Sequence, residues 1–274
     1  MGYFYEEEKK FREVMEKLIL YSDRIDNVYG LYEEVYGKEY GDGESGREIE
    51  ELAEKISLFF ENVKEKYNYC LLEMDTDTLI YKVDDHYKND MMNLTKVIEQ
   101  ITADDFEKMC ALFLKEIVKC ESVNATQRSH DQGIDFVGYK KYIQCLTTEE
   151  QNKNLLYVIG QAKHYKDTCV DTKEIRELAG AVYLLRTNDF AKKRNGKSEK
   201  VIYSNLNIDA FTPIVPCFIT SNYFSDYAYV LCRNAAIIAI DRLSLILNFL
   251  FSNKFNAMSQ KEIMEEIQSI ERIK

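Results

Sequence analysis

The chain has 274 residues, enough for one large domain or two modest ones. Hydrophobic residues make up 46% and prolines number only 2, which favours a helix-rich chain with an ordinary core over a disordered linker. The formal net charge of -11 argues against nucleic-acid binding by the chain as a whole.

The negative charge is concentrated in one segment. Residues 1–100 hold 13 of the 36 basic and 25 of the 47 acidic side chains, so residues 101–274 are close to neutral. The acidity therefore does not exclude a basic surface in the second segment.

The sequence indicates a cytoplasmic protein without membrane spans. Its start, GYFYEEEKK, lacks the basic-then-apolar order of a signal peptide, and no apolar stretch reaches the ~20 residues of a membrane span. The 7 cysteines form no C-x-x-C pair, which argues against a zinc ribbon. Each is expected to be a reduced, buried thiol.

Residues 1–100 are expected to form an acidic helical domain. A single helix is predicted over 4–36, because a narrow apolar seam alternates steps of four and three at Phe11, Met15, Leu18, Ser22, Ile25, Tyr29, Tyr32 and Tyr36. The Gly-rich loop GKEYGDGESG and a second helix from about residue 49 to 67 would complete an antiparallel hairpin. Two short strands within 70–83 and a helix over 84–100 follow.

Residues 101–254 predict an α/β domain with a mixed central sheet flanked by helices. Thr102 and Asp105 have the spacing of a capping box that opens the first helix. Buried strands and helices then alternate, with strands expected at about 121–127, 134–145, 155–163, 214–220 and 236–240 and helices at 171–186, 225–233 and 242–251. Residues 255–274 are expected to end the chain as an amphipathic helix.

Two short patterns in the strands carry candidate site residues. In Gly133-Ile134-Asp135-Phe136 a carboxylate interrupts an apolar strand start, and burying it is costly unless it is paired or bound to a metal. In Gln161-Ala162-Lys163 the first and third residues share one strand face.

These residue types fit a magnesium or manganese site. Asp135 offers a charged oxygen and Gln161 a neutral one, and Mg²⁺ prefers such ligands. Lys163 could orient a water and stabilise charge on a phosphate. Glu107, at the border of the first helix's apolar stripe, could reach the end of the sheet.

Each pattern has a simpler explanation when it stands alone. A Gly-x-Asp is most often a turn, and a Gln-x-Lys on a strand is most often a solvated face. Glu107 is also explained as an acid favoured at a helix N-terminus. The residues alone therefore indicate an α/β domain with a plausible metal site.

A longer series of motifs resembles the Mrr-type restriction endonuclease family, a branch of the PD-(D/E)XK nucleases with Gln in place of the second acid. The motifs span 101–250 and read ITADDFEKMCALFL, SHDQGIDFVGY, YVIGQAKHY, VDTKEIRELAGAVYLL, PIVPCFITSNYFSDYA and AIIAIDRLSLILNFL. The resemblance implies that Asp135 and Gln161 are metal ligands, that Lys163 is the catalytic lysine, and that Glu107 is the supporting helix acid.

The chain departs from this family at two positions. Gln132 stands where a second glycine is usual, and Arg242 follows Asp241 where the family usually has Asp-Gly. Neither change removes a catalytic residue type, so an active enzyme is expected.

Basic residues near the motifs are candidates for backbone phosphate contacts. They are Lys166, Lys173 and Arg176 after the lysine strand, and Lys192, Lys193, Arg194 and Lys197 in a polar insertion. Ordinary solvated charges remain the alternative for both groups. His130 and His164 flank the motifs, but the chemistry above does not require a histidine.

The resemblance implies a metal-dependent endodeoxyribonuclease of prokaryotic restriction or antiviral defence, with DNA as its partner. The alternatives are a structure-selective nuclease, similar to a junction resolvase, and a non-cleaving scaffold with a degenerate site. For residues 1–100 the possible roles are assembly into a homodimer or larger complex through the helical seam, regulation of the DNA groove, docking to a defence partner, or simple packing.

Overall fold

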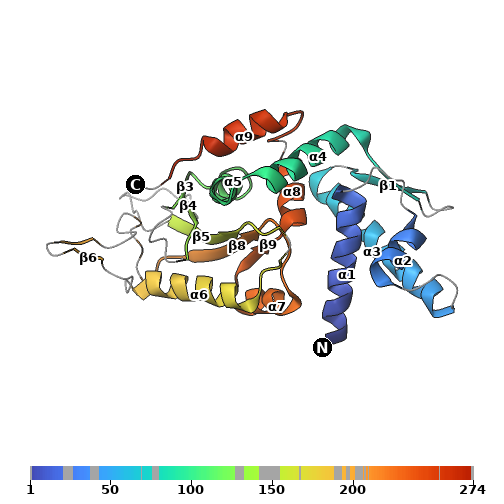
Figure 1. Cartoon of the computed structure of the whole chain (residues 1–274), viewed down its shortest axis with the longest axis horizontal. Coiled ribbons are helices and arrows are strands. Elements are labelled where there is room, and N and C mark those ends of the chain that lie inside the picture. The colour runs from blue at the N-terminus through green and yellow to red at the C-terminus, as the bar shows by residue number, and fades with distance from the viewer. Residues whose placement is uncertain are drawn as a thin grey trace. The chain divides into compact units, whose positions relative to one another are not determined.

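The computed structural model divides the chain into two compact units, residues 1–96 with 253–260 and residues 97–252 with 261–274. Figure 1 shows the helices and strands of both. The residues that the structure describes are 2–20, 27–37, 43–68, 70–75, 80–126, 133–141, 155–166, 168–187, 193–195, 198–200, 206, 208, 210–252 and 254–272.

The first unit begins with three helices, α1 (Gly2–Leu20), α2 (Val28–Tyr36) and α3 (Gly43–Tyr67). The prediction of one continuous helix over 4–36 is wrong. Asn27 has an extended backbone, and its side chain accepts a hydrogen bond from the Tyr29 amide at 2.8 Å, so a new helix starts there. The local cap overrides the heptad spacing.

The predicted seam is buried in part inside this unit, and its Ser22 and Ile25 lie outside the described residues. Met15 and Leu18 of α1, Tyr32 of α2 and Ile56 of α3 are all buried, and α2 contacts both other helices. Lys17 of α1 also forms an ion pair with Glu34 of α2. The helices of one chain therefore already cover much of the apolar surface that the sequence offered to a second chain.

The remaining elements of the first unit agree with the prediction. Strands β1 (Leu72–Asp75) and β2 (Ile80–Val83) form an antiparallel pair, and α4 (Asp85–Gln100) follows. Buried Asp90 on α4 accepts a hydrogen bond from the amide of Ala257 at 3.0 Å.

The second unit contains the predicted mixed sheet, with strand order β3-β4-β5-β8-β9. The first three strands are antiparallel, whereas β5, β8 and β9 are parallel. The bounds are β3 (Ser122–Ala125), β4 (Phe136–Lys141), β5 (Leu155–Lys163), β8 (Ile214–Thr220) and β9 (Ile238–Ile240). β9 is an edge strand with Ile238 45% exposed, which corrects the expectation of a fully buried strand.

Helices cover both faces of this sheet (Figure 1). Helices α5 (Ala103–Glu116) and α8 (Arg242–Phe251) contact one another and the sheet, and α6 (Thr172–Thr187) and α7 (Asp226–Asn234) form a second contacting pair. The predicted cap at Thr102 is confirmed, because its hydroxyl accepts from the Asp105 amide at 3.1 Å. Ser225 caps α7 in the same way, with its hydroxyl accepting from the Ala228 amide at 3.3 Å.

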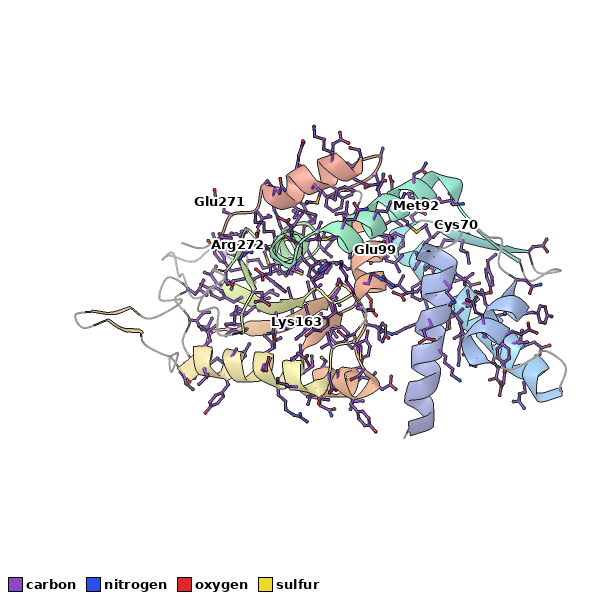
Figure 2. The ribbon with its side chains drawn as sticks, in the orientation of Figure 1. Cys70, Met92, Glu99, Lys163, Glu271 and Arg272 are labelled. Carbon is purple, nitrogen blue, oxygen red and sulfur yellow. The ribbon has the colours of Figure 1, made fainter. Side chains whose placement is uncertain are left out.

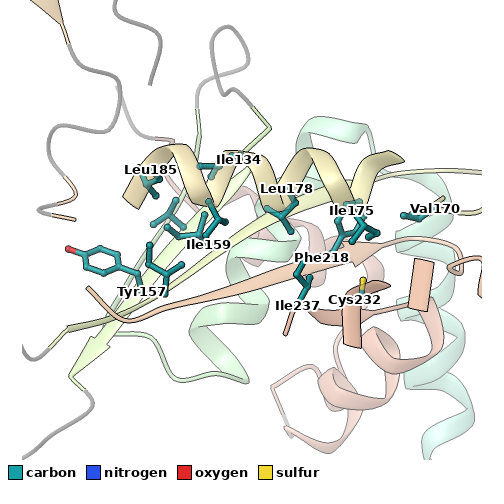
Figure 3. Packing of buried hydrophobic residues seen from close by; sticks show 14 of the residues in the cluster. Ile134, Tyr157, Ile159, Val170, Ile175, Leu178, Leu185, Phe218, Cys232 and Ile237 are labelled. Carbon is teal, nitrogen blue, oxygen red and sulfur yellow. The ribbon is translucent and has the colours of Figure 1, made fainter. Parts of the chain in front are cut away.

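A hydrophobic cluster holds α6 and α7 against the sheet (Figure 3). It includes Ile159 of β5, Phe218 of β8, and Ile175 and Leu178 of α6, all of them completely buried. Odd-numbered residues of β5 therefore face α6. By strand alternation, Gln161 and Lys163 lie on this same face of the sheet.

The unit also contains a projecting pair of strands and a C-terminal helix. β6 (Lys193–Asn195) and β7 (Ser198–Lys200) are antiparallel, and α9 (Gln260–Gln268) precedes the last described residues. No helix within the described ranges combines the length and apolar character needed to cross a membrane.

Gly160 of β5 is required by close packing. A Cβ atom there would lie 2.0 Å from the Phe136 ring and 2.6 Å from the Cys217 carbonyl oxygen. A Cβ atom at Gly180, which is exposed on α6, would have no described atom within 4 Å. The two glycines therefore form a matched pair for substitution.

We expect Gly160→Ala to lower the free energy of unfolding by about 3 kcal/mol, because overpacking forces a rigid ring and backbone apart. Gly180→Ala should raise it by about 0.5–1 kcal/mol, because alanine favours the helix. Chemical denaturation followed by circular dichroism measures both. Equal stability of Gly160→Ala and the unsubstituted chain would contradict the packing assigned to this strand.

Candidate active site

Asp135 is a buried carboxylate fixed at the start of β4. Its backbone amide donates to the Gly160 carbonyl at 2.8 Å, and its Oδ2 accepts from the Ala162 amide at 2.7 Å. The side chain is only 6% exposed. Gly133, with φ of 84°, provides the left-handed turn that leads the chain into this position.

Gln161 lies beside Asp135 on the neighbouring strand. The antiparallel register ends at the pair Phe136–Gly160, and Asp135 is hydrogen bonded to Gly160 and to Ala162, the residues on either side of Gln161. Gln161 is 3% exposed, and within the described part of the chain its buried Oε1 has no hydrogen-bond partner. A buried acceptor without a donor costs about 1–3 kcal/mol, so this oxygen is suited to a cation or a bound water.

Lys163 follows two residues later on the same strand face. Its side chain is partly exposed, and Figure 2 labels it at the sheet. Its carbonyl accepts from the Ser221 amide at 3.0 Å and from the Thr220 hydroxyl at 3.1 Å, so β8 fixes the backbone at this point. Strand alternation therefore places the Lys163 side chain on the same face of β5 as Gln161.

Glu107 lies on α5 and contacts the C-terminal segment. Its Oε2 accepts from Arg272 at 2.7 Å. Glu107 and Asp135 share Cys110 as a neighbour: burial raises the pKa of the Cys110 thiol well above its ordinary value, and the charges of Cys217, Asp135 and Glu107 raise it further. The helix acid therefore lies near the candidate ligands.

These residues fit a divalent cation as part of its ligand shell. Asp135 supplies a carboxylate, whose Oδ2 accepts from the Ala162 amide, and the amide oxygen of Gln161, which lacks a partner among the described residues, is a hard, neutral ligand. No group of three or more His, Cys, Asp or Glu side chains that could hold a metal occurs among the described residues. Waters and substrate phosphates would have to supply the other ligands.

The histidines do not add to this group. The ring of His164 contacts Phe106, and its Nε2 lies 2.8 Å from the Ile98 carbonyl oxygen. As the residue after Lys163, His164 points to the opposite side of the chain. His130 lies outside the described residues, as does Gln132.

The candidate phosphate-contacting residues Lys166, Lys173 and Arg176 all have exposed side chains. Lys166 and Lys173 are exposed, and Lys173 lies 3.9 Å from Glu177. Exposed Arg176 donates to the Thr172 hydroxyl at 3.2 Å.

In the insertion, Lys193 and Arg194 belong to β6, whereas Lys192 and Lys197 lie outside the described residues.

The Asp241-Arg242 departure has a local explanation. Asp241 caps α8 by accepting from the Ser244 amide at 2.8 Å, and it also accepts from the Tyr229 hydroxyl at 2.8 Å. Arg242 is the first helical residue, so glycine's conformational freedom is not needed at this position.

The structure also shows residues that sequence reasoning missed. The Thr126 amide donates to the Asp135 carbonyl at 2.9 Å, and its hydroxyl donates to the Ile134 carbonyl at 2.6 Å. Arg272 was not singled out because its partner Glu107 is 165 positions away. The prediction of buried cysteines is confirmed for Cys110, Cys120, Cys217 and Cys232. It is wrong for exposed Cys70, Cys169 is only half-buried, and Cys145 lies outside the described residues.

The sheet and its helices form an α/β domain whose candidate ligands meet at the start of β4 and the end of β5. Residues 98–191 match the Mrr_cat family model, described as restriction endonuclease. This match agrees with the resemblance of the sequence motifs to the Mrr-type family. The match includes Glu107, Asp135, Gln161 and Lys163. No curated protein compared with the chain matches it.

Comparison with solved structures gives distant matches. "MspJI Restriction Endonuclease in Complex with 27-mer Oligonucleotide" has a TM-score of 0.42 at 13% identity, covering 66% of this chain and 35% of that one. "DNA modification-dependent restriction endonuclease AspBHI" has a TM-score of 0.45 at 13% identity, covering 70% and 45%. The chain spans less than half the length of either protein.

The burial of the Cys110 and Cys217 thiols can be tested by alkylation. We expect Cys70 to react in the native protein, whereas Cys110 and Cys217 react only after unfolding. Burial raises the pKa of Cys217 to about 12, so a shift from pH 7 to 9 leaves it protonated and unreactive. Peptide mass spectrometry locates the modified residues. Rapid labelling of Cys110 in the native protein would contradict its burial.

Proposed function

We propose that the second unit is a divalent-metal-dependent endodeoxyribonuclease. The supporting observation is the buried oxygen of Gln161, which has no hydrogen-bond partner among the described residues, beside buried Asp135 and on the strand that also carries Lys163. A purely structural glutamine would normally find a donor for that oxygen. The restriction endonuclease domain supplies the chemical context.

In this proposal Asp135 and Gln161 would hold Mg²⁺ or Mn²⁺, which supplies Lewis-acid stabilisation of the phosphate and lowers the pKa of a water. Lys163 has two tasks that its own chemistry allows. Its ammonium donates hydrogen bonds to a non-bridging phosphate oxygen, and it orients the attacking water toward phosphorus. By analogy with the family, cleavage leaves a 5′-phosphate.

Contacts to the DNA backbone are proposed for Lys166, Lys173 and Arg176. The last two lie on the exposed surface of α6, whose buried face packs on the sheet beside the site. Such contacts supply affinity that weakens with salt and carries no sequence information. The strands β6 and β7 bring Lys193 and Arg194 as further candidates.

The biological setting is proposed to be prokaryotic restriction or antiviral defence, in the cytoplasm. The exposed acidic side chains of α2 and α3, such as Glu33, Glu50 and Glu54, disfavour DNA and suit regulation or a protein partner. Assembly into a homodimer through the first unit remains a prediction, and the buried Met15, Leu18 and Tyr32 of the seam are not available to it without rearrangement.

Two alternatives lead to different results with the same protein. A structure-selective nuclease would prefer branched DNA over plain duplex, and a scaffold would bind without cutting. Methylated, plain and branched substrates, with RNA alongside, separate these possibilities.

The decisive variant is Lys163→Ala. We expect cleavage to fall about 100-fold or more, because the variant loses a charged group that acts on the transition state. The control is Lys115→Ala, which removes an equal charge from the exposed end of α5. Rates are measured by the conversion of supercoiled plasmid with Mg²⁺, with Mn²⁺ and with chelator.

Cleavage that survives Lys163→Ala would remove the role assigned to the lysine. Cleavage that persists in the presence of chelator would contradict the proposed metal dependence. Binding without cleavage of any substrate would support the scaffold instead.

A further inference from the structure

The C-terminal segment is built into the nuclease unit next to α5. The amide of Ala125 on β3 donates to the Glu271 carbonyl at 3.1 Å, and Ala125 and Arg272 form a parallel β-bridge. Figure 2 labels Glu271 and Arg272 beside α5. The segment thus extends the edge of the sheet, and this pairing sets the position of Arg272.

The Arg272 guanidinium joins the helix acids to the backbone that holds Asp135. It donates to the Glu107 carboxylate at 2.7 Å and to the Asp104 carbonyl at 3.2 Å, and it also contacts the Asp104 carboxylate. Its other terminal nitrogen donates to the Thr126 carbonyl. Thr126 is hydrogen bonded to the Asp135 and Ile134 carbonyls, so one side chain bridges α5 and the strand start.

This arrangement differs from an ordinary surface ion pair. The side chains of Arg272 and Glu107 are each only 21% exposed, and among described atoms the buried Nε of Arg272 has no hydrogen-bond partner. Partial desolvation strengthens the attraction between the charges, whereas exposed pairs contribute little. Lysine could not reproduce the planar fork that reaches a carboxylate and a carbonyl together.

We propose that Arg272 is a positioning residue of the nuclease site that acts through Glu107. The inference rests on the proposed metal-dependent function. Arg272 fixes the Glu107 carboxylate near Cys110 and Asp135, where it supports the waters of a metal held by Asp135 and Gln161. It also offsets the repulsion among the carboxylates of Asp104, Glu107 and Asp135. The working site thus extends well beyond residues 98–191.

The test measures metal binding by the full chain, without DNA. Isothermal titration with Mn²⁺ compares the unsubstituted protein with Arg272→Gln, Glu107→Gln and the double variant. Loss of an outer-shell partner typically weakens metal binding about 10–100-fold, so we expect each single variant to raise the Kd about 10-fold. Because Arg272 acts through Glu107, the double variant should match Glu107→Gln alone.

The charge-matched control is Lys261→Gln. Lys261 lies on α9, its side chain is 86% exposed, and its partner is Glu265 on the same helix. The control should leave the Kd unchanged, because an exposed charge of this kind is screened. Thermal unfolding of every variant separates a loss of fold from a loss of binding.

The outcomes separate this inference from the proposed function. An unchanged Kd in folded Arg272→Gln, or an effect of equal size with and without Glu107, overturns the positioning role alone. If Arg272→Gln does not fold, Arg272→Lys replaces it, and an unchanged Kd there has the same meaning. Absent Mn²⁺ binding by the unsubstituted protein, or binding unaffected by Asp135→Asn, overturns the metal site and this inference with it.

Discussion

The hydrogen bond from the Ala162 amide to the Asp135 carboxylate organises the candidate site. It joins the start of β4 to the end of β5, so the carboxylate takes the place of a strand partner where the ladder ends. A buried carboxylate is tolerated only when such bonds compensate for lost water. The same contact fixes Asp135 beside Gln161. Close packing at Gly160, against Phe136, keeps the two strands in that register.

Sequence periodicity predicted the second unit well because its elements satisfy local rules. The strand at 155–163 and the caps at Thr102 and Ser225 rest on patterns only a few residues long, and the structure has them in place. The break before α2 was missed because Asn27 provides a cap that competes with a heptad pattern of similar local strength. Whether the helix continues through residue 27 or restarts there depends on tertiary packing, and the periodicity of the sequence carries no information about that packing.

The candidate site was predictable only in part, for a physical reason. Gln161 and Lys163 share a face by strand alternation alone, so their relation is visible in the sequence. Asp135 comes beside Gln161 through a strand register, and Glu107 meets Arg272 through chain segments 165 positions apart. Such contacts carry no local signal. The family resemblance suggested the roles of Asp135, Gln161 and Lys163. Arg272, in contrast, lies outside the matched residues 98–191.

The charges around the candidate site also have both local and long-range causes. Glu107 and Asp104 at the start of α5 are explained locally, since acids favour a helix N-terminus. Together with Asp135 they also accumulate negative charge at the place where the proposed function would bring a phosphodiester. A cation held by Asp135 and Gln161 would reduce that charge from within the site, and Arg272 reduces it from the side of α5. The proposed function thus requires that cations placed by segments remote in sequence balance the carboxylates at this end of the sheet.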